Sequence, residues 1–154
     1  MHTKKAKQWI VTADTNACVI YSHIQYSHAL TFVQRLSHPE NKLRDIELTS
    51  DKPGHYQTGG TARGAYEQET DPKEHLIDLL ALEIANVLDH ARTQHQYEQW
   101  VLIALPHMNG LIKKHLNKHV AECLQQSIEK NTMHMSAEEL FEVLSAQTRA
   151  QLKM

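Results

Sequence analysis

One continuous apolar run constrains the fold more than any other part of this 154-residue chain. Residues Trp100 to Leu105 read WVLIAL, a pattern that is typical of a strand buried on both faces of a sheet. Such a strand needs a covering layer on each side. The turn PHMNG follows directly, and an expected helix from Leu111 to Lys118 completes a strand-loop-helix unit. The run therefore predicts an α/β fold.

Several runs rich in strand-forming residues precede this unit. Residues Trp9–Ala13 and Ala17–Ile24 flank the polar segment Asp14–Asn16, which predicts an antiparallel hairpin with a tight connection. Residues His28–Leu36 fit both a strand alternation and a helix face, and we favour a third strand. Residues Leu43–Leu48 are expected to form a short edge strand that leads into a long loop.

A strong helix signal begins at Asp71. We expect Asp71 as the N-cap, Pro72 at the first helical position and Glu74 at the third, a pattern that satisfies free backbone N–H groups. The helix should continue to about Gln94. Its apolar face comprises Leu76, Leu80, Ile84, Val87, Leu88 and Ala91.

Two weaker signals complete the chain. Residues Val120–Ile128 are expected to hold a last strand, and Ser136 with Glu139 forms a capping box before a closing helix. The whole order predicts a single α/β domain over residues 1–154. In this domain, a mixed β-sheet begins as an antiparallel meander, continues through strand-helix units and is covered by helices. Ribonuclease-H-like folds and the central domain of archaeal and eukaryotic release factors share this order.

Composition and charge exclude some classes of function. A net charge of -2 and a pI near 6.6 argue against a generally basic nucleic-acid binder, so such contacts must come from local patches. No stretch approaches the roughly 20 apolar residues of a membrane-spanning helix, and the N-terminus lacks the apolar region of a signal peptide. We therefore expect a soluble, cytoplasmic protein without membrane contact. Cys18 and Cys123 sit among apolar neighbours and are expected to be core residues.

Known catalytic patterns are incomplete in this chain. A metal-dependent nuclease of the ribonuclease-H type could use Asp14 with Glu74 or Asp78, but Leu105 and Pro106 occupy the third position, where a carboxylate is needed. Asp14 is better explained as a turn residue and Glu74 as a capping residue. The sequence also lacks the common nucleophile and nucleotide-binding motifs. We expect no catalytic residue, no metal site and no cofactor.

The side chains of His115 and His119 could meet one metal ion, because the two residues are four apart on the expected helix. The residues between them include no Glu in the zinc-protease position, and we expect both side chains to be solvent-exposed.

The glycine-containing loop from Ser50 to Pro72 is the first candidate binding site. Its glycines allow positive φ angles and a close backbone approach, and its polar side chains suit phosphate or carboxylate. The alternative is a mobile surface loop without a ligand. The candidate residues are Lys52, His55, Gly59, Gly60, Thr61 and Arg63.

The end of the apolar strand is the second candidate site. A lysine pair follows the turn, near the start of the expected second helix, where the helix dipole favours anions. Ligands of α/β sheets often bind at such strand ends. The loop and the strand end would form one composite site if they meet, whereas a solvated lysine pair is the alternative. The candidate residues here are His107, Asn109, Gly110, Lys113 and Lys114.

Several segments together resemble a bacterial family of host attachment proteins, which is grouped with release-factor-like proteins of bacteria and archaea. These segments are WIVTAD, LSHPENKLRDIEL, SDKPG at Ser50–Gly54, GGTAR with DP at Asp71, and LIALPHMNGLIKKHL. They occur in the family's order and cover most of the chain.

The resemblance implies a domain similar to the release-factor central domain, and hence an association with the ribosome or tRNA. Gly59 and Gly60 are similar to the glycine pair of the release-factor Gly-Gly-Gln loop, but Thr61 stands in place of the Gln. We therefore expect a non-catalytic binding module. A hydrolase acting on an RNA or ester bond and a regulatory protein-binding domain that influences attachment are the alternatives.

Overall fold

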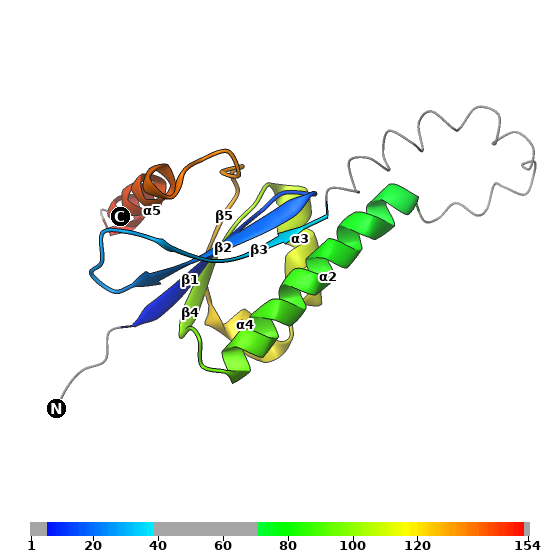
Figure 1. Cartoon of the computed structure of the whole chain (residues 1–154), viewed down its shortest axis with the longest axis horizontal. Coiled ribbons are helices and arrows are strands. Elements are labelled where there is room, and N and C mark those ends of the chain that lie inside the picture. Colours follow the sequence, from blue (N-terminus) through cyan, green and yellow to red (C-terminus); the bar gives the residue numbers. More distant parts are fainter. Residues whose placement is uncertain (1–5, 39–70, 153–154) are drawn as a thin grey trace, which may run out of the picture.

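The chain forms a five-stranded sheet with helices on both faces, as described for residues 6–38 and 71–152 of a computed structural model (Figure 1). The predicted mixed α/β fold is confirmed. In chain order the elements are β1 (Lys7–Ala13), β2 (Ala17–Ile24), β3 (Thr31–Ser37), α2 (Pro72–Thr93), β4 (Gln99–Ile103), α3 (Pro106–His115), α4 (Lys118–Cys123), β5 (Leu124–Ile128) and α5 (Ala137–Leu152).

The sheet has the strand order β3-β2-β1-β4-β5. The strands β1, β2 and β3 pair in antiparallel fashion, whereas β4 is parallel to both β1 and β5. The predicted hairpin and third strand are therefore confirmed, although β3 begins at Thr31 and not at His28. Asp14 is the expected turn residue, because its Oδ1 accepts hydrogen bonds from the backbone N–H groups of Asn16 and Ala17.

The central strands are buried on both faces because side chains alternate along them. Trp9, Val11 and Ala13 face the core beneath α2, α3 and α4, whereas Ile10 faces the second core. In Figure 1, α5 lies on the opposite side of the sheet from these three helices. Leu140 of α5 is almost fully buried in the second core.

The helix α2 agrees with its prediction. The side chain of Asp71 accepts a hydrogen bond from the backbone N–H of Lys73, and Pro72 occupies the first helical turn. The helix ends at Thr93, followed by Gln94 as the C-cap.

The chain after β4 differs from its prediction. The helix α3 begins at Pro106, so the predicted turn PHMNG is helical and the predicted helix Leu111–Lys118 is wrong in its bounds. Pro106 is compatible with a helix start because a first-turn residue needs no intrahelical N–H bond. Asn117 then caps a separate short helix through a hydrogen bond from the Val120 N–H, so only the end of the predicted strand Val120–Ile128 is a strand.

Strand β3 ends, and helix α2 begins, at one edge of the sheet. Since β1, β3 and β4 run in the same direction, their carboxyl ends share that edge. His38 follows β3, its backbone N–H bonds the carbonyl of Asn16, and its Nε2 lies 2.6 Å from the Glu83 carboxylate of α2. The predicted strand Leu43–Leu48 and most of the glycine loop lie outside the described residues.

Within the described part of the chain, no helix is both long and apolar enough to cross a membrane.

Candidate functional site

The structure describes one of the two groups of predicted site residues. Lys52, His55, Gly59, Gly60, Thr61 and Arg63 lie outside the described residues. His107, Asn109, Gly110, Lys113 and Lys114 all belong to α3.

Asn109 is a structural residue and does not face a ligand. Its side chain is 2% exposed, and its Nδ2 donates hydrogen bonds to the Ala104 carbonyl at 3.3 Å and to Ser127 Oγ at 2.9 Å. The Ser127 hydroxyl in turn donates to Asn109 Oδ1 at 3.1 Å. These bonds tie α3 to the ends of β4 and β5, which leaves Asn109 no free polar group to offer a ligand.

Gly110 does not provide the close approach expected of a glycine in a turn. It lies inside α3, and a side chain at this position would meet nothing within 4 Å. Another residue could replace it without a clash.

His107 remains at the carboxyl end of β4, as predicted. Its Nε2 lies 3.0 Å from a carboxylate oxygen of Glu74, and both side chains are about half exposed, at 56% and 48%. The contact joins the first turns of α2 and α3. Exposed ion pairs of this kind contribute little to stability, so His107 is free to exchange this partner for another.

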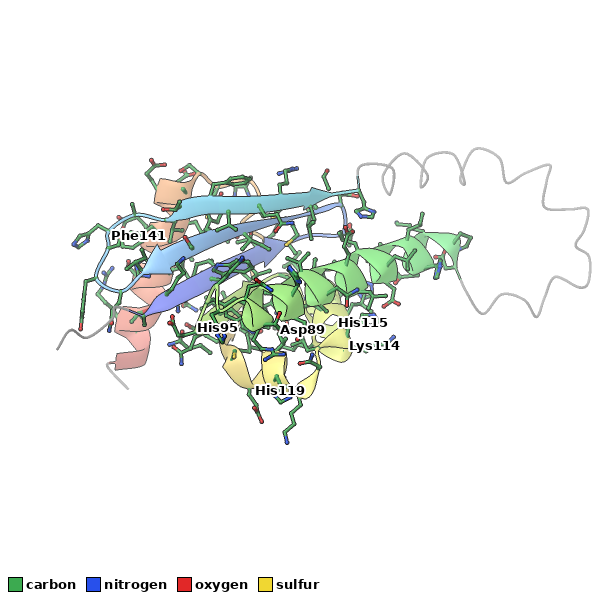
Figure 2. All side chains as sticks on the ribbon, turned by 60° about the horizontal axis from the view of Figure 1, so that its bottom comes forward. Asp89, His95, Lys114, His115, His119 and Phe141 are labelled. Carbon is green, nitrogen blue, oxygen red and sulfur yellow. The ribbon has the colours of Figure 1, made fainter. Side chains whose placement is uncertain are left out.

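Lys113 and Lys114 lie in the last turn of α3, not near its start as predicted. The negative end of the helix dipole, and not its anion-binding end, is therefore nearest to them. Lys118 and His119 of the following helix α4 are also exposed, so four exposed basic side chains fall within the segment 113–119. Figure 2 labels two of them, Lys114 and His119. We call Lys113, Lys114, Lys118 and His119 the basic patch.

Two members of the basic patch are free of acidic partners. Among the described residues, no carboxylate pairs with Lys113 or Lys118, whereas the Lys114 ammonium lies 3.9 Å from Asp78. An exposed lysine without an internal partner is available to an external anion such as a phosphate.

Two aspartates of α2 hold the basic patch in place. Asp78 accepts a hydrogen bond from His115 Nε2 at 2.8 Å, and this bond is the largest reason that the pKa of Asp78 falls below its usual range. The pKa of Asp89 is also lowered, first by a hydrogen bond from Asn117 and then by one from Arg92. Because Asn117 also caps α4, Asp89 fixes the position of that helix against α2.

The two members of the histidine pair lie on different helices. His115 belongs to α3 and bonds Asp78, whereas His119 belongs to α4. The expected exposure is correct for His119 but wrong for His115, whose side chain is 18% exposed. Among the described residues, no three His, Cys, Asp or Glu side chains come close enough to share a metal ion.

Two other candidate reactive groups, Asp14 and Cys18, have structural surroundings. Asp14 accepts two backbone hydrogen bonds in its turn. The Cys18 thiol is fully buried, and this burial, with Asp14 and Glu83 nearby, raises its pKa. A thiol with a raised pKa forms little thiolate, so Cys18 is a poor nucleophile. The expectation that Cys18 belongs to the core is confirmed.

Sequence reasoning missed the contribution of Lys118 to the basic patch. The signal that could have identified it is Asn117, since an Asn before a Lys-His-Val segment is a common N-cap and ends one helix before another begins. That boundary brings Lys113 and Lys118 to the same junction of two helices.

Comparison with known proteins then gives the family. A family model described as "protein required for attachment to host cells" matches residues 9–144. The chain belongs to this host attachment family. No curated protein matches it. A solved structure described as an archaeal protein is similar at a TM-score of 0.44 and 8% sequence identity, with 96% of this chain and 39% of that chain covered. The chain thus spans less than half the length of that archaeal protein.

Proposed function

We propose that this host attachment family member is a non-catalytic binding module that contacts RNA of the ribosome or of tRNA through the basic patch. The observation that carries the proposal is the junction of α3 and α4, where Lys113 and Lys118 are exposed and have no acidic partner among the described residues. Lysines on one surface neutralise phosphates and release counterions, which suffices for binding in a protein of net charge -2.

We propose that the glycine-containing loop from Ser50 to Pro72 supplies a second part of this contact. Lys52 and Arg63, with Gly59 and Gly60, belong to the segment between β3 and α2. His38 and Asp71, which flank it, lie near the carboxyl edge of the sheet, as does His107. Lys52 and Arg63 would add two basic groups to the contact that the basic patch makes with RNA.

An indirect, intracellular effect on attachment fits this proposal. Cys18 and Cys123 are free thiols, and free thiols are usual in a reducing compartment. Since the Cys18 thiol is buried, it needs no partner. We therefore propose that the protein acts in the cytoplasm on the synthesis of other proteins, and that adhesion to a host follows from their products.

The experiment is fluorescence anisotropy with labelled tRNA at stepped salt, supported by co-sedimentation with ribosomes. Binding should weaken steeply with salt, and Lys113→Gln and Lys118→Gln should each reduce the slope of log K against log salt by about 1. Lys130→Gln, an exposed lysine outside the basic patch, is the matched control and should leave the slope unchanged. Salt-independent binding, or equal slopes in all variants, would overturn the proposal.

The loop is tested separately with the triple variant Gly59→Ala, Gly60→Ala, Arg63→Ala. We expect it to lose salt-sensitive migration with ribosomes on sucrose gradients. Normal migration of this variant would remove the loop from the proposed contact and leave the basic patch alone.

A regulatory protein-binding domain is the second candidate, because α2 exposes two leucines one turn apart. Leu79 is 41% exposed and Leu82 is 37% exposed, on the outer face of the helix. Apolar side chains that lie together on a surface favour a protein partner. If Leu79→Gln with Leu82→Gln impairs attachment in cells while Lys113→Gln does not, this candidate replaces the RNA-binding proposal.

A further inference from the structure

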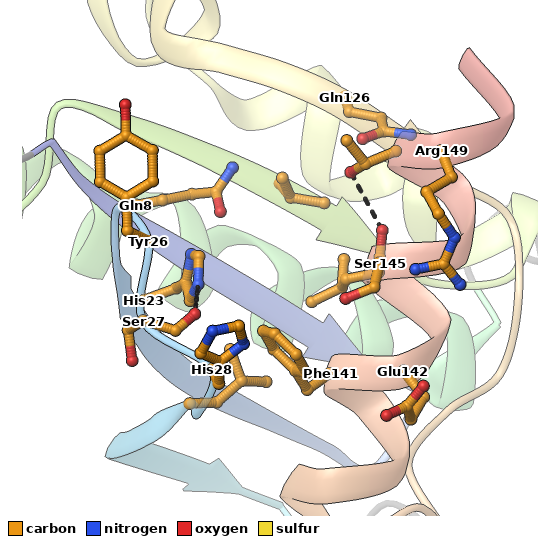
Figure 3. A pocket seen from close by; sticks show the side chains of 14 residues that line it. Gln8, His23, Tyr26, Ser27, His28, Gln126, Phe141, Glu142, Ser145 and Arg149 are labelled. Carbon is orange, nitrogen blue, oxygen red and sulfur yellow. Dashed lines mark hydrogen bonds between the residues drawn. The ribbon is translucent and has the colours of Figure 1, made fainter. Parts of the chain in front are cut away.

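A groove lies between α5 and the sheet, on the face opposite the basic patch. Its volume is about 640 Å³, within the range of pockets that hold one small ligand (Figure 3). Leu140 and Leu144 of α5 pack in the second core, and Leu144, Ser145, Thr148 and Arg149 of the same helix line the groove. Nothing in the proposed RNA contact uses this groove.

One side of the groove is a wall of rings. The rings of His23 and Phe141 have centroids 5.8 Å apart, and those of His28 and Phe141 are 6.3 Å apart with an edge-to-face tilt. His23 Nε2 lies 2.9 Å from the carbonyl oxygen of Ser27, which can only accept, so this nitrogen carries the proton. The bond fixes the ring of His23 beside Phe141 and leaves Nδ1 as an acceptor in the neutral imidazole.

Tyr26 lines the same side of the groove, and its backbone is strained. It has a φ of 72°, a conformation that non-glycine residues rarely adopt, and its side chain is 76% exposed although it lines the groove. Strained residues that persist on a surface are concentrated at ligand sites. The turn between β2 and β3 thus holds a fourth ring at the groove at some cost in stability.

The other side of the groove is polar and lacks internal partners. Within the described part of the chain, the side chains of Gln126 and Ser145 make no hydrogen bond to another protein group, and Arg149 pairs with no carboxylate. Glu142 is the acidic member of the lining and lies two helical turns before Arg149, roughly 10 Å along the axis. Figure 3 shows Arg149 beside Gln126, and Glu142 beside Phe141.

We propose that this groove binds a free nucleoside monophosphate. Its base would stack on the ring of Phe141, with the ring of His28 at its edge, because aromatic faces bind bases of any sequence. The phosphate would bind Arg149, whose guanidinium suits phosphate oxygens. Glu142 repels the phosphate from the ring end and so sets the orientation. The amide of Gln126, which Figure 3 draws near Arg149, can both donate and accept.

The test is isothermal titration calorimetry of the full chain with AMP, GMP, CMP and UMP, with inorganic phosphate as the ring-free probe. We expect the purine nucleotides to bind more tightly than the pyrimidine nucleotides, because their larger rings cover more of the wall, and phosphate alone to give no heat. Arg149→Gln and Phe141→Leu should each weaken AMP roughly tenfold. Arg35→Gln, which removes an exposed arginine outside the groove, is the matched control and should bind AMP like the native protein.

Ser145→Phe provides a second test that keeps all the proposed contacts. It fills the groove from α5 and should abolish AMP binding while the melting temperature stays unchanged. No heat with any of the four nucleotides would overturn the proposal. AMP binding that is unchanged in Arg149→Gln, that survives Ser145→Phe, or that falls equally with Arg35→Gln, would also overturn it.

Discussion

His115 Nε2 lies 2.8 Å from a carboxylate oxygen of Asp78, and this contact joins the end of α3 to the second turn of α2. It is one of three such pairs along α2, since Glu74 contacts His107 and Glu83 contacts His38. Two of the pairs connect α2 to the two ends of α3, and the third connects it to the residue that follows β3. The acidic side of α2 therefore positions both the basic patch and the residues that flank segment 39–70.

The Asp78 contact should make stability depend on acid pH. The folded-state pKa of Asp78 lies below its ordinary value of 3.8, so the contact stabilises fully above that value and is lost as pH falls through the folded pKa. We expect Asp78→Asn to lower stability by about 0.5 kcal/mol at neutral pH, because the pair is partly exposed. The difference from native protein should stay constant down to about pH 4 and then close.

Thermal unfolding across this pH range checks the prediction. Glu129→Gln removes an exposed carboxylate that makes no hydrogen bond or ion pair with another described residue, and it should show no such closing gap. A gap between Asp78→Asn and native protein that widens in acid would contradict the assignment.

Asn109 should matter for stability and not for binding. Asn109→Ala leaves the Ala104 carbonyl and the Ser127 hydroxyl without their buried partner, so we expect a loss of about 2 kcal/mol. The matched control is Asn86→Ala, an exposed position on α2 where alanine is the better helix former. Chemical denaturation measures both. Loss of tRNA binding by a folded Asn109→Ala variant would contradict this prediction and indicate a ligand role for Asn109.

The sequence predicts Lys113 and Lys114 near the start of a helix, whereas they lie in the last turn of α3. Leu105 offers no side-chain cap at the start of α3, and the Asn109–Gly110 pair suggested a turn. The usable signal was Pro106, which favours a first helical turn. Because the helix begins at Pro106 and not at Leu111, Lys113 lies in its last turn and not in its first. This one boundary therefore determines which end of the helix dipole is near Lys113.

Elements with strong local signals were predicted well. Trp9 and its strand neighbours, the Asp71 cap and the Ser136–Glu139 capping box each depend on residues that are close in sequence. The capping box is reciprocal, with Ser136 N–H bonding Glu139 and the Glu139 N–H bonding Ser136 Oγ. The groove could not be predicted in this way, because it depends on how the β2–β3 turn meets α5.

The two cysteines should differ in reactivity. Cys18 is fully buried with a raised pKa, whereas Cys123 is partly exposed. We expect one thiol of the native protein to react quickly with a disulfide reagent and the second only after unfolding, because the thiolate is the reacting species. Cys123→Ser should remove the fast phase. Two fast phases in native protein would show that Cys18 is reached without unfolding.

The Tyr26→Gly variant should be more stable than the Tyr26→Ala variant, which is the reverse of the usual order of these two residues. Both substitutions remove the exposed ring, but only Tyr26→Gly relieves the positive φ, by about 1 kcal/mol. At ordinary positions glycine is instead the less stable of the two. Chemical denaturation of the two variants isolates the backbone effect, and a more stable Tyr26→Ala would contradict the strain. Since both variants lack the ring, both should bind AMP more weakly than native protein by the same factor. That result would show that the strained turn serves to present the ring of Tyr26 to the groove.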